Sequence, residues 1–186
     1  MAQGRSSFFI IILTIIITFF SSLVAAEEDK WQVEDWGKGV ISVSTHGKVQ
    51  HGDKIYFRLK KSNCDVLEHA FTFYTVANHK RIKLLEKELV PLDNNEMKIY
   101  GEVKLVFPFL MEHMAWISLG HYNVDDHIKL MEEIGQFNIE IIDKKNFIAE
   151  DYFDIPTNEW DLINFKSGYH KRSKIMSTNP YLTFGL

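Results

Sequence analysis

The chain has 186 residues, of which 21 are Lys or Arg and 25 are Asp or Glu, so its formal net charge is −4. A mildly acidic chain lacks the basic face that marks a nucleic-acid-binding protein, and it is not built to adhere to anionic membranes. Composition therefore argues against both classes of partner.

Residues 1–26 predict a secretory signal peptide. Arg5 is the only charged residue in this stretch, and a largely apolar run extends from Phe8 to Phe20. Val24 and Ala26 fill the −3 and −1 positions of a cleavage site, so we expect cleavage after Ala26. The alternative is an uncleaved membrane anchor, but the apolar segment barely reaches the roughly 20 residues that a spanning helix needs. After cleavage we expect no stable membrane span.

The mature chain, residues 27–186, has a length that suits one domain with a full hydrophobic core. We expect it to be β-rich, with a loosely held tail from about residue 170. Cys64 is the only cysteine, so an internal disulfide cannot form and the fold must rest on packing. Because small eukaryotic secreted domains usually carry several disulfides, we favour a bacterial protein, either periplasmic or extracellular.

Alternation of apolar and polar residues predicts antiparallel strands in the first half of the mature chain. A polar lead-in over residues 27–38 precedes the first of them. Strands are expected over 41–45, over 54–60 and, after a loop at 61–65, over about 70–76.

The segment 81–90 has both helical spacing and a following turn at 91–95, and we interpret it as a strand. The clearest strand of the chain follows, over residues 96–107. Gly101 at its centre predicts a bulge or bend, and Pro108 is expected to end the strand.

A further strand is expected over residues 115–122, with Trp116 and Ile117 on opposite faces. Asp125 or Asp126 is suited to cap a short helix that reaches about Glu133, and Gly135 is suited to stop it.

The last elements predicted are a strand over 137–142 and a helix that Thr157 or Asn158 caps and that runs to about Tyr169. About seven short strands with two short helices are typical of an antiparallel β-sandwich of the immunoglobulin-like kind. An antiparallel β-barrel is the alternative architecture.

A histidine- and methionine-rich stretch supplies the first candidate site. We take His113, His121, Asp125 and His127 as candidate ligands for copper or zinc, since imidazole binds both metals. His113 and His121 share a strand face but are eight residues apart, about 26 Å along an extended strand. His121, Asp125 and His127 converge more easily, because a turn and the start of a helix separate them. The competing interpretation is that these residues serve as surface, core and capping groups, so no cofactor is the default expectation.

Cys64 and His69 supply a second candidate, a thiol nucleophile with its general base. No local signature of a thiol enzyme surrounds them, and a buried, inert thiol is the default for a lone cysteine. Catalysis is therefore the weakest of the three interpretations.

Trp31 and Trp36 supply the third candidate, a contact surface for a ligand or partner, because both lie among charges and outside any strong strand pattern. We favour an exported binding or accessory protein of the cell envelope over a catalyst. Its expected partner is another envelope protein, met through an open sheet edge or through this tryptophan-bearing segment. A copper or zinc carrier is the alternative function, and a thiol hydrolase the second alternative.

Overall fold

A computed structural model describes residues 30–49, 52–75, 79–109 and 112–177. The predicted signal peptide lies outside the described residues, and the fold below is that of the unit Trp31–Leu186. Among the described residues, no helix has both the length and the apolar character to cross a membrane.

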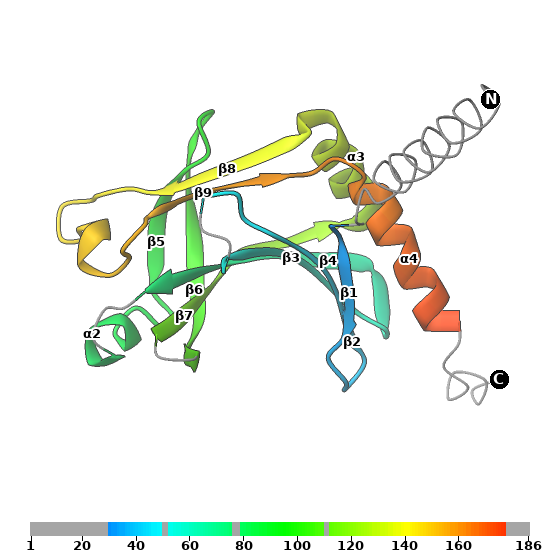
Figure 1. Ribbon diagram of the computed structural model, residues 1–186, viewed down its shortest axis with the longest axis horizontal. Coiled ribbons are helices and arrows are strands. Elements are labelled where there is room, and N and C mark those ends of the chain that lie inside the picture. The colour runs from blue at the N-terminus through cyan, green and yellow to red at the C-terminus, as the bar shows by residue number, and fades with distance from the viewer. Residues whose placement is uncertain (1–29, 50–51, 76–78, 110–111, 178–186) are drawn as a thin grey trace, which may run out of the picture. The chain divides into compact units, whose positions relative to one another are not determined.

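The described strands form one antiparallel sheet, in the order β1-β2-β3-β4-β7-β6-β5-β8-β9 (Figure 1). Neighbours along the chain are mostly neighbours in the sheet, and the long strands β4, β6 and β7 form its middle. The strands are β1 Gln32–Asp35, β2 Val40–His46, β3 Lys54–Lys60, β4 Asn63–Thr75, β5 Leu89–Asp93, β6 Lys98–Phe109, β7 Glu112–Asn123, β8 Gln136–Ile141 and β9 Thr157–Asp161.

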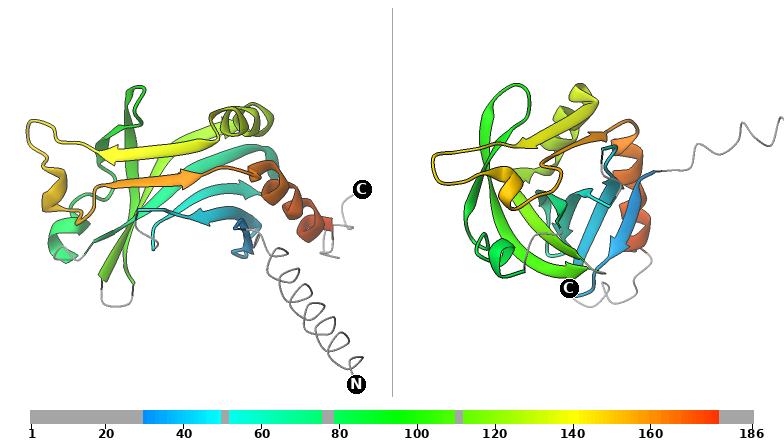
Figure 2. Two further views of the ribbon diagram at one scale, coloured as in Figure 1. Left: turned by 45° about the horizontal axis from the view of Figure 1, so that its top comes forward. Right: turned by 60° about the vertical axis from the view of Figure 1, so that its left-hand side comes forward.

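The sheet is strongly curled, as the two views in Figure 2 show. The prediction of a mainly β, antiparallel protein is confirmed. The two-sheet sandwich is not the arrangement found, since all nine strands belong to one sheet, and the alternative barrel-like architecture fits better. Both architectures place apolar residues at every second position, so strand periodicity alone does not separate them.

The inner face of the curl holds the hydrophobic core. Phe57, Phe71, Phe73 and Trp160 point into it and are fully buried. Two helices, α3 (Val124–Ile134) and α4 (Phe165–Ser177), add their apolar residues to the same core, while α2 (His79–Lys83) and a 3₁₀ turn (Ala149–Asp151) fill connections.

The turn between β2 and β3 docks on β9 and helps to hold the curl. The backbone N–H of Lys48 donates to the carbonyl of Glu159 at 2.8 Å, and that of Val49 donates to Asn158 Oδ1 at 3.1 Å. Asn158 Nδ2 in turn donates to Asp53 Oδ2 at 2.9 Å, and the Tyr74 N–H donates to Asp53 Oδ1 at 2.7 Å. This network is buried. Burial raises the pKa of the Asp53 carboxyl to about 7, against the lowering effect of its two hydrogen bonds.

Several predicted elements differ from the observed ones. Pro108 does not end its strand, since β6 continues to Phe109, and the expected loop over 61–65 contains the start of β4 at Asn63. The expected lead-in over 27–38 contains the edge strand β1, whose four residues pair with β2. The expected strand over 81–90 is divided between the end of α2, a turn and the start of β5. The expected helix from residue 157 begins as β9 instead, because Trp160 and Asn158 point into the core on alternate positions and pairing with β8 satisfies the backbone.

Helix α3 is present as predicted, but its cap is Asn123, two residues before Asp125 and three before Asp126. The Asn123 carboxamide oxygen accepts from the N–H groups of Asp125 and Asp126, so these two residues lie in the first turn. Gly135 ends the helix in the left-handed conformation, as expected. Helix α4 extends to Ser177, and residues 178–186 of the expected tail lie outside the described residues.

Gly101 is a close-packing position rather than the bulge. The register of β6 against β7 shifts between Val103 and Leu105, whereas a Cβ on Gly101 would lie 2.5 Å from Ile117 Cγ2 and 2.9 Å from Leu92 Cδ1.

A side chain at Gly101 would overpack the core and destabilise the folded state. Gly101→Ala is therefore expected to lower the free energy of unfolding by about 2 kcal/mol in urea denaturation. The exposed Lys98→Ala on the same strand is the control, and equal effects of the two substitutions would contradict the packing argument.

Candidate functional site

The outer face of the curled sheet carries a broad apolar groove. In β3 the alternation that sends Ile55 and Phe57 into the core turns Lys54, Tyr56 and Arg58 to this outer face. The groove has a volume of about 720 Å³. Its apolar and aromatic lining residues come from β3, β4, β6, β7 and the segment after β1, and comprise Trp36, Tyr56, Tyr74, Leu105, Phe107, Phe109, Met114 and Trp116.

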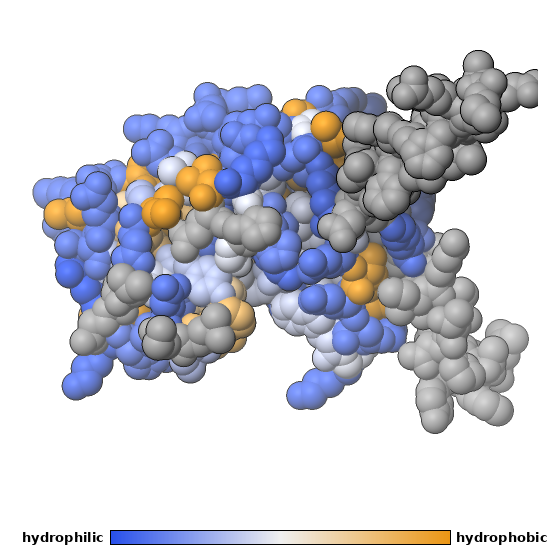
Figure 3. Space-filling model, in the orientation of Figure 1, coloured by the Kyte–Doolittle hydropathy of each residue, from blue (hydrophilic) through white to orange (hydrophobic). Residues whose placement is uncertain are grey.

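A cluster of three aromatic rings forms one end of this groove. The Tyr56 and Trp116 ring centroids are 4.5 Å apart, and Trp36 lies edge-on to Trp116 at 5.4 Å. Tyr56 and Trp116 are buried, whereas the side chain of Trp36 is 42% exposed. Figure 3 shows pale residues gathered along the lower side of the molecule, with orange residues there and also scattered over the upper part of this view.

Arg58 fixes the aromatic cluster in place. Its guanidinium lies 4.4 Å from the Trp116 ring centroid and 5.3 Å from that of Trp36. The same guanidinium forms an ion pair with Glu68, to which Nε donates at 2.8 Å. With its charge paired with Glu68 and its guanidinium in contact with both rings, Arg58 acts as a support for Trp36 and Trp116.

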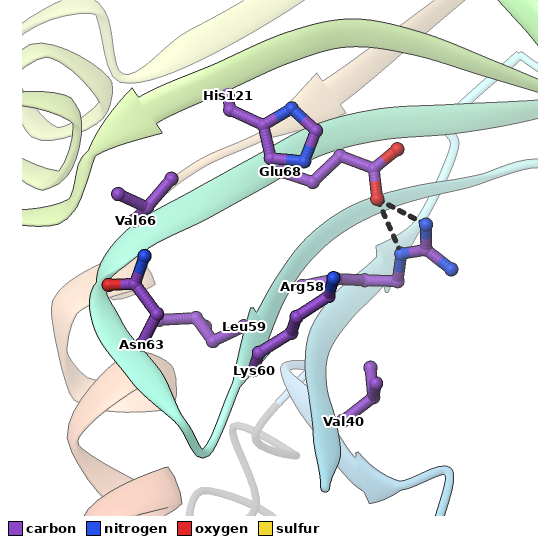
Figure 4. A pocket seen from close by; sticks show the side chains of 8 residues that line it. All are labelled: Val40, Arg58, Leu59, Lys60, Asn63, Val66, Glu68 and His121. Atoms are coloured by element: carbon purple, nitrogen blue, oxygen red, sulfur yellow. Dashed lines mark hydrogen bonds and ion pairs between the residues drawn. The ribbon is translucent and has the colours of Figure 1, made fainter. Parts of the chain in front are cut away.

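A second, smaller cavity of about 360 Å³ lies on the other side of Arg58. Figure 4 shows the Arg58–Glu68 pair at its wall, with the ring of His121 beside the Glu68 side chain. Glu68 and His121 are register partners on β4 and β7. The Arg58–Glu68 pair therefore separates two hollows on one face of the sheet.

The polar residues that line the large groove are all basic or imidazole groups, namely His46, Lys54, Arg58 and Lys104. Arg58 is paired with Glu68, and Lys104 with Glu102. Lys54 differs, since its ammonium donates at 2.7 Å to the neutral carboxamide of Gln32.

The four candidate metal ligands are spread over the two ends of β7 and helix α3. His113 lies at one end of β7, with its ring 4.7 Å from that of His79, and His121 lies at the other end. Asp125 is exposed, and His127 points into the core. Within the described ranges, three or more His, Cys, Asp or Glu side chains do not come together in a way that could hold a metal. Copper or zinc binding stays an untested prediction.

His127 contacts His69, which lies 58 positions away in the sequence. Its Nε2 lies 3.2 Å from Nδ1 of His69, and both rings are buried. The His127 ring stacks on Tyr122 at 4.5 Å, and the His69 ring stacks on Phe57 at 4.8 Å. Burial lowers the pKa of His127 to about 4, and burial together with the neighbouring His127 holds the pKa of His69 well below its usual value. Two neutral imidazoles therefore share one hydrogen bond inside the protein.

Cys64 and His69 have separate surroundings. The Cys64 thiol is half-buried near the start of β4 and donates to the carbonyl oxygen of Lys61, while the His69 ring packs on His127 and Phe57. The catalytic interpretation of this pair gains no geometric support and stays untested.

The two candidate tryptophans have different roles in the fold. Trp31 is 3% exposed, packs on Phe165 at 5.0 Å and donates its indole N–H to the carbonyl of Ile163. It is thus a core residue in the described fold. Trp36 is exposed at the groove, and its indole N–H donates to Glu34. Trp36 is therefore the one of the two that is placed to meet a ligand.

The chain was compared with protein-family models, with curated proteins and with solved structures, and no match was found in any of the three comparisons.

Proposed function

We propose that this is an exported, non-catalytic binding protein of the cell envelope that holds a small apolar ligand in the outer-face groove. The observation that supports the proposal is the groove itself. Its volume of about 720 Å³ falls within the range typical of small-molecule sites, roughly 300–1,000 Å³, and its lining is mainly aromatic and aliphatic.

The arrangement around Trp36 and Trp116 further favours binding. Rings that are already held by Arg58 lose little conformational entropy when a ligand packs on them, so their contact area contributes to affinity. Export is proposed on the sequence of residues 1–26 alone.

A neutral fluorescent probe, N-phenyl-1-naphthylamine, tests the groove. We expect saturable binding of one probe per mature chain and at least tenfold weaker binding by Leu105→Lys, which places a charge at the exposed mouth of the groove. Leu89→Lys is the matched control, since Leu89 is also an exposed leucine but lies on β5, away from the groove lining. Equal affinity of the two variants, or an absence of saturable binding, would overturn the proposal.

A second candidate function is capture of another envelope protein by strand addition at β1. The observation that favours it is the position of β1, which is the terminal strand of the nine-strand order and is largely exposed. A Val33→Pro substitution would remove a backbone donor from this short edge strand. Loss of a partner from envelope pull-downs, with probe binding in the groove intact, would favour this candidate over the first.

A further inference from the structure

The large groove is electrostatically biased. Its polar lining consists of His46 and three cationic side chains, without a carboxylate among the described lining residues. The chain as a whole has a net charge of −4, so this grouping of basic side chains runs against the composition. A site of this kind favours ligands that carry negative charge.

The three cations are not equivalent. Arg58 is neutralised by Glu68 and lies against two tryptophan rings, and Lys104 is neutralised by Glu102. Lys54 is half-buried on the wall of the groove, and its ammonium donates to the neutral Gln32. An ammonium has three N–H donors, so Lys54 can donate to a ligand while it keeps its hydrogen bond to Gln32.

Lys54 lies beside the aromatic cluster, since its backbone bonds to Thr72 and Thr72 pairs with Trp116. Tyr74 and Phe109 continue the apolar lining on its other side. Lys54 and His46 are register partners on β3 and β2, and the aromatic cluster begins two residues further along β3, at Tyr56. The carboxylate of Glu34 lies at the Trp36 end, where it accepts the indole N–H. A ligand with an acidic group at one end would therefore place that group beside Lys54 rather than beside Trp36.

We propose that the groove binds a free amphipathic acid, with its apolar body on the Trp36–Tyr56–Trp116 cluster and its carboxylate paired with the ammonium of Lys54. The proposal rests on the proposed function, since it requires a groove that binds a small ligand. It deepens that function by assigning the chemical class of the ligand and the residue that selects it.

Three displacers with one alkyl body test the ligand class. Decanoate, decanol and decyltrimethylammonium are each used, below their micelle concentrations, to displace N-phenyl-1-naphthylamine from the mature wild-type protein. We expect decanoate to displace the probe at about tenfold lower concentration than decanol, and decyltrimethylammonium to be the weakest, because only the carboxylate forms an ion pair with the ammonium. Added salt is expected to weaken decanoate alone.

Two substitutions on β3 test the anchor. Lys54→Met keeps a long apolar side chain, and we expect it to reduce the affinity for decanoate about tenfold while leaving that for decanol unchanged. Lys60→Met is the matched control, because Lys60 lies on the same strand but lines the smaller cavity. It is expected to change neither affinity.

The outcomes distinguish a wrong ligand class or a wrong anchor residue from failure of the proposed binding function. If the probe binds and decanol displaces it as well as decanoate does, the binding function stands and the acid class is wrong. If Lys54→Met leaves the preference for decanoate intact, Lys54 is not the anchor and the inference fails. If the probe does not bind the wild-type protein in a saturable manner, the proposed function itself fails.

Discussion

Replacing Asn158 with alanine is expected to lower the free energy of unfolding by about 3–5 kcal/mol at pH 7, as measured by urea denaturation. Asn158 is 1% exposed and serves both as donor to Asp53 and as acceptor for the N–H groups of Val49 and Glu159. Alanine leaves these groups without their partner, and the cost of a buried polar group without a partner exceeds the gain from making the bond.

Two further variants distinguish the stability lost with this hydrogen-bond network from the stability lost when any side chain of this size is removed. Asn138→Ala on the neighbouring strand β8 removes a half-buried carboxamide and is expected to cost less than about 1 kcal/mol. Asn158→Asp keeps the shape but places a second carboxyl beside Asp53. We expect it to be close to wild type near pH 4, where the pair holds a proton, and strongly destabilised at pH 8. A pH-independent effect of Asn158→Asp would contradict the proposed contact.

Acidification from pH 6.5 to pH 4 is expected to cost roughly 3 kcal/mol of stability through His127, with a further loss through His69 in the same direction. The pKa of each buried imidazole is lowered in the folded state, so the unfolded chain binds more protons in this pH range. The stability contributed by the neutral pair is therefore fully present above about pH 6.5 and is lost as the pH falls toward the folded-state pKa values.

Asp53 has the opposite effect on the free energy of unfolding over nearly the same pH range. Its folded-state pKa is raised to about 7, so its contribution is greatest below pH 3.8 and is lost as the pH rises to 7, by roughly 4 kcal/mol. The double variant His69→Phe/His127→Phe replaces both rings by apolar rings of similar shape and should fold. We expect its stability to decrease steadily from pH 4 to pH 7, because only the Asp53 effect remains.

A His121→Gln variant is the control for the histidine effect, since His121 is exposed on the outer face. It should reproduce the wild-type dependence of unfolding free energy on pH. A double variant with the same pH dependence as the wild type would refute the role assigned to the buried pair.

Local patterns were sufficient to identify most strands but not their arrangement. The alternation in β3 and β6 is strong because one face of each strand is buried, and both were located within two residues. Residues 157–161 (TNEWD) predict the start of a helix, because Thr157 and Asn158 belong to residue types that often cap helices. In the structure this segment pairs with β8 and forms strand β9. Whether strands form one sheet or two depends on contacts between distant residues, which periodicity does not report.

Only part of the candidate site can be predicted from the sequence. The exposure of Trp36 agrees with its polar surroundings, but Trp31 has similar neighbours and is buried by Phe165, 134 positions further along the chain. The pairing of His69 with His127 links β4 to α3 and has no local signal. The groove did have one signal, since Lys54, Tyr56 and Arg58 alternate with core residues and therefore had to share the outer face.

The contacts that close the curled sheet have a consequence for the order of folding. Asn158 and Asp53 are 105 positions apart along the chain, and Trp31 and Ile163 are 132 apart. Joining such distant segments requires the loop-closure entropy of most of the chain to be overcome before the contacts form, which slows folding. A chain that emerges from its N-terminus first could pair β1 through β4 early, but the buried Asp53 would lack its partner until residue 158 had emerged. Completion of the fold is thus delayed until the last quarter of the chain has emerged, an order that suits the export proposed above.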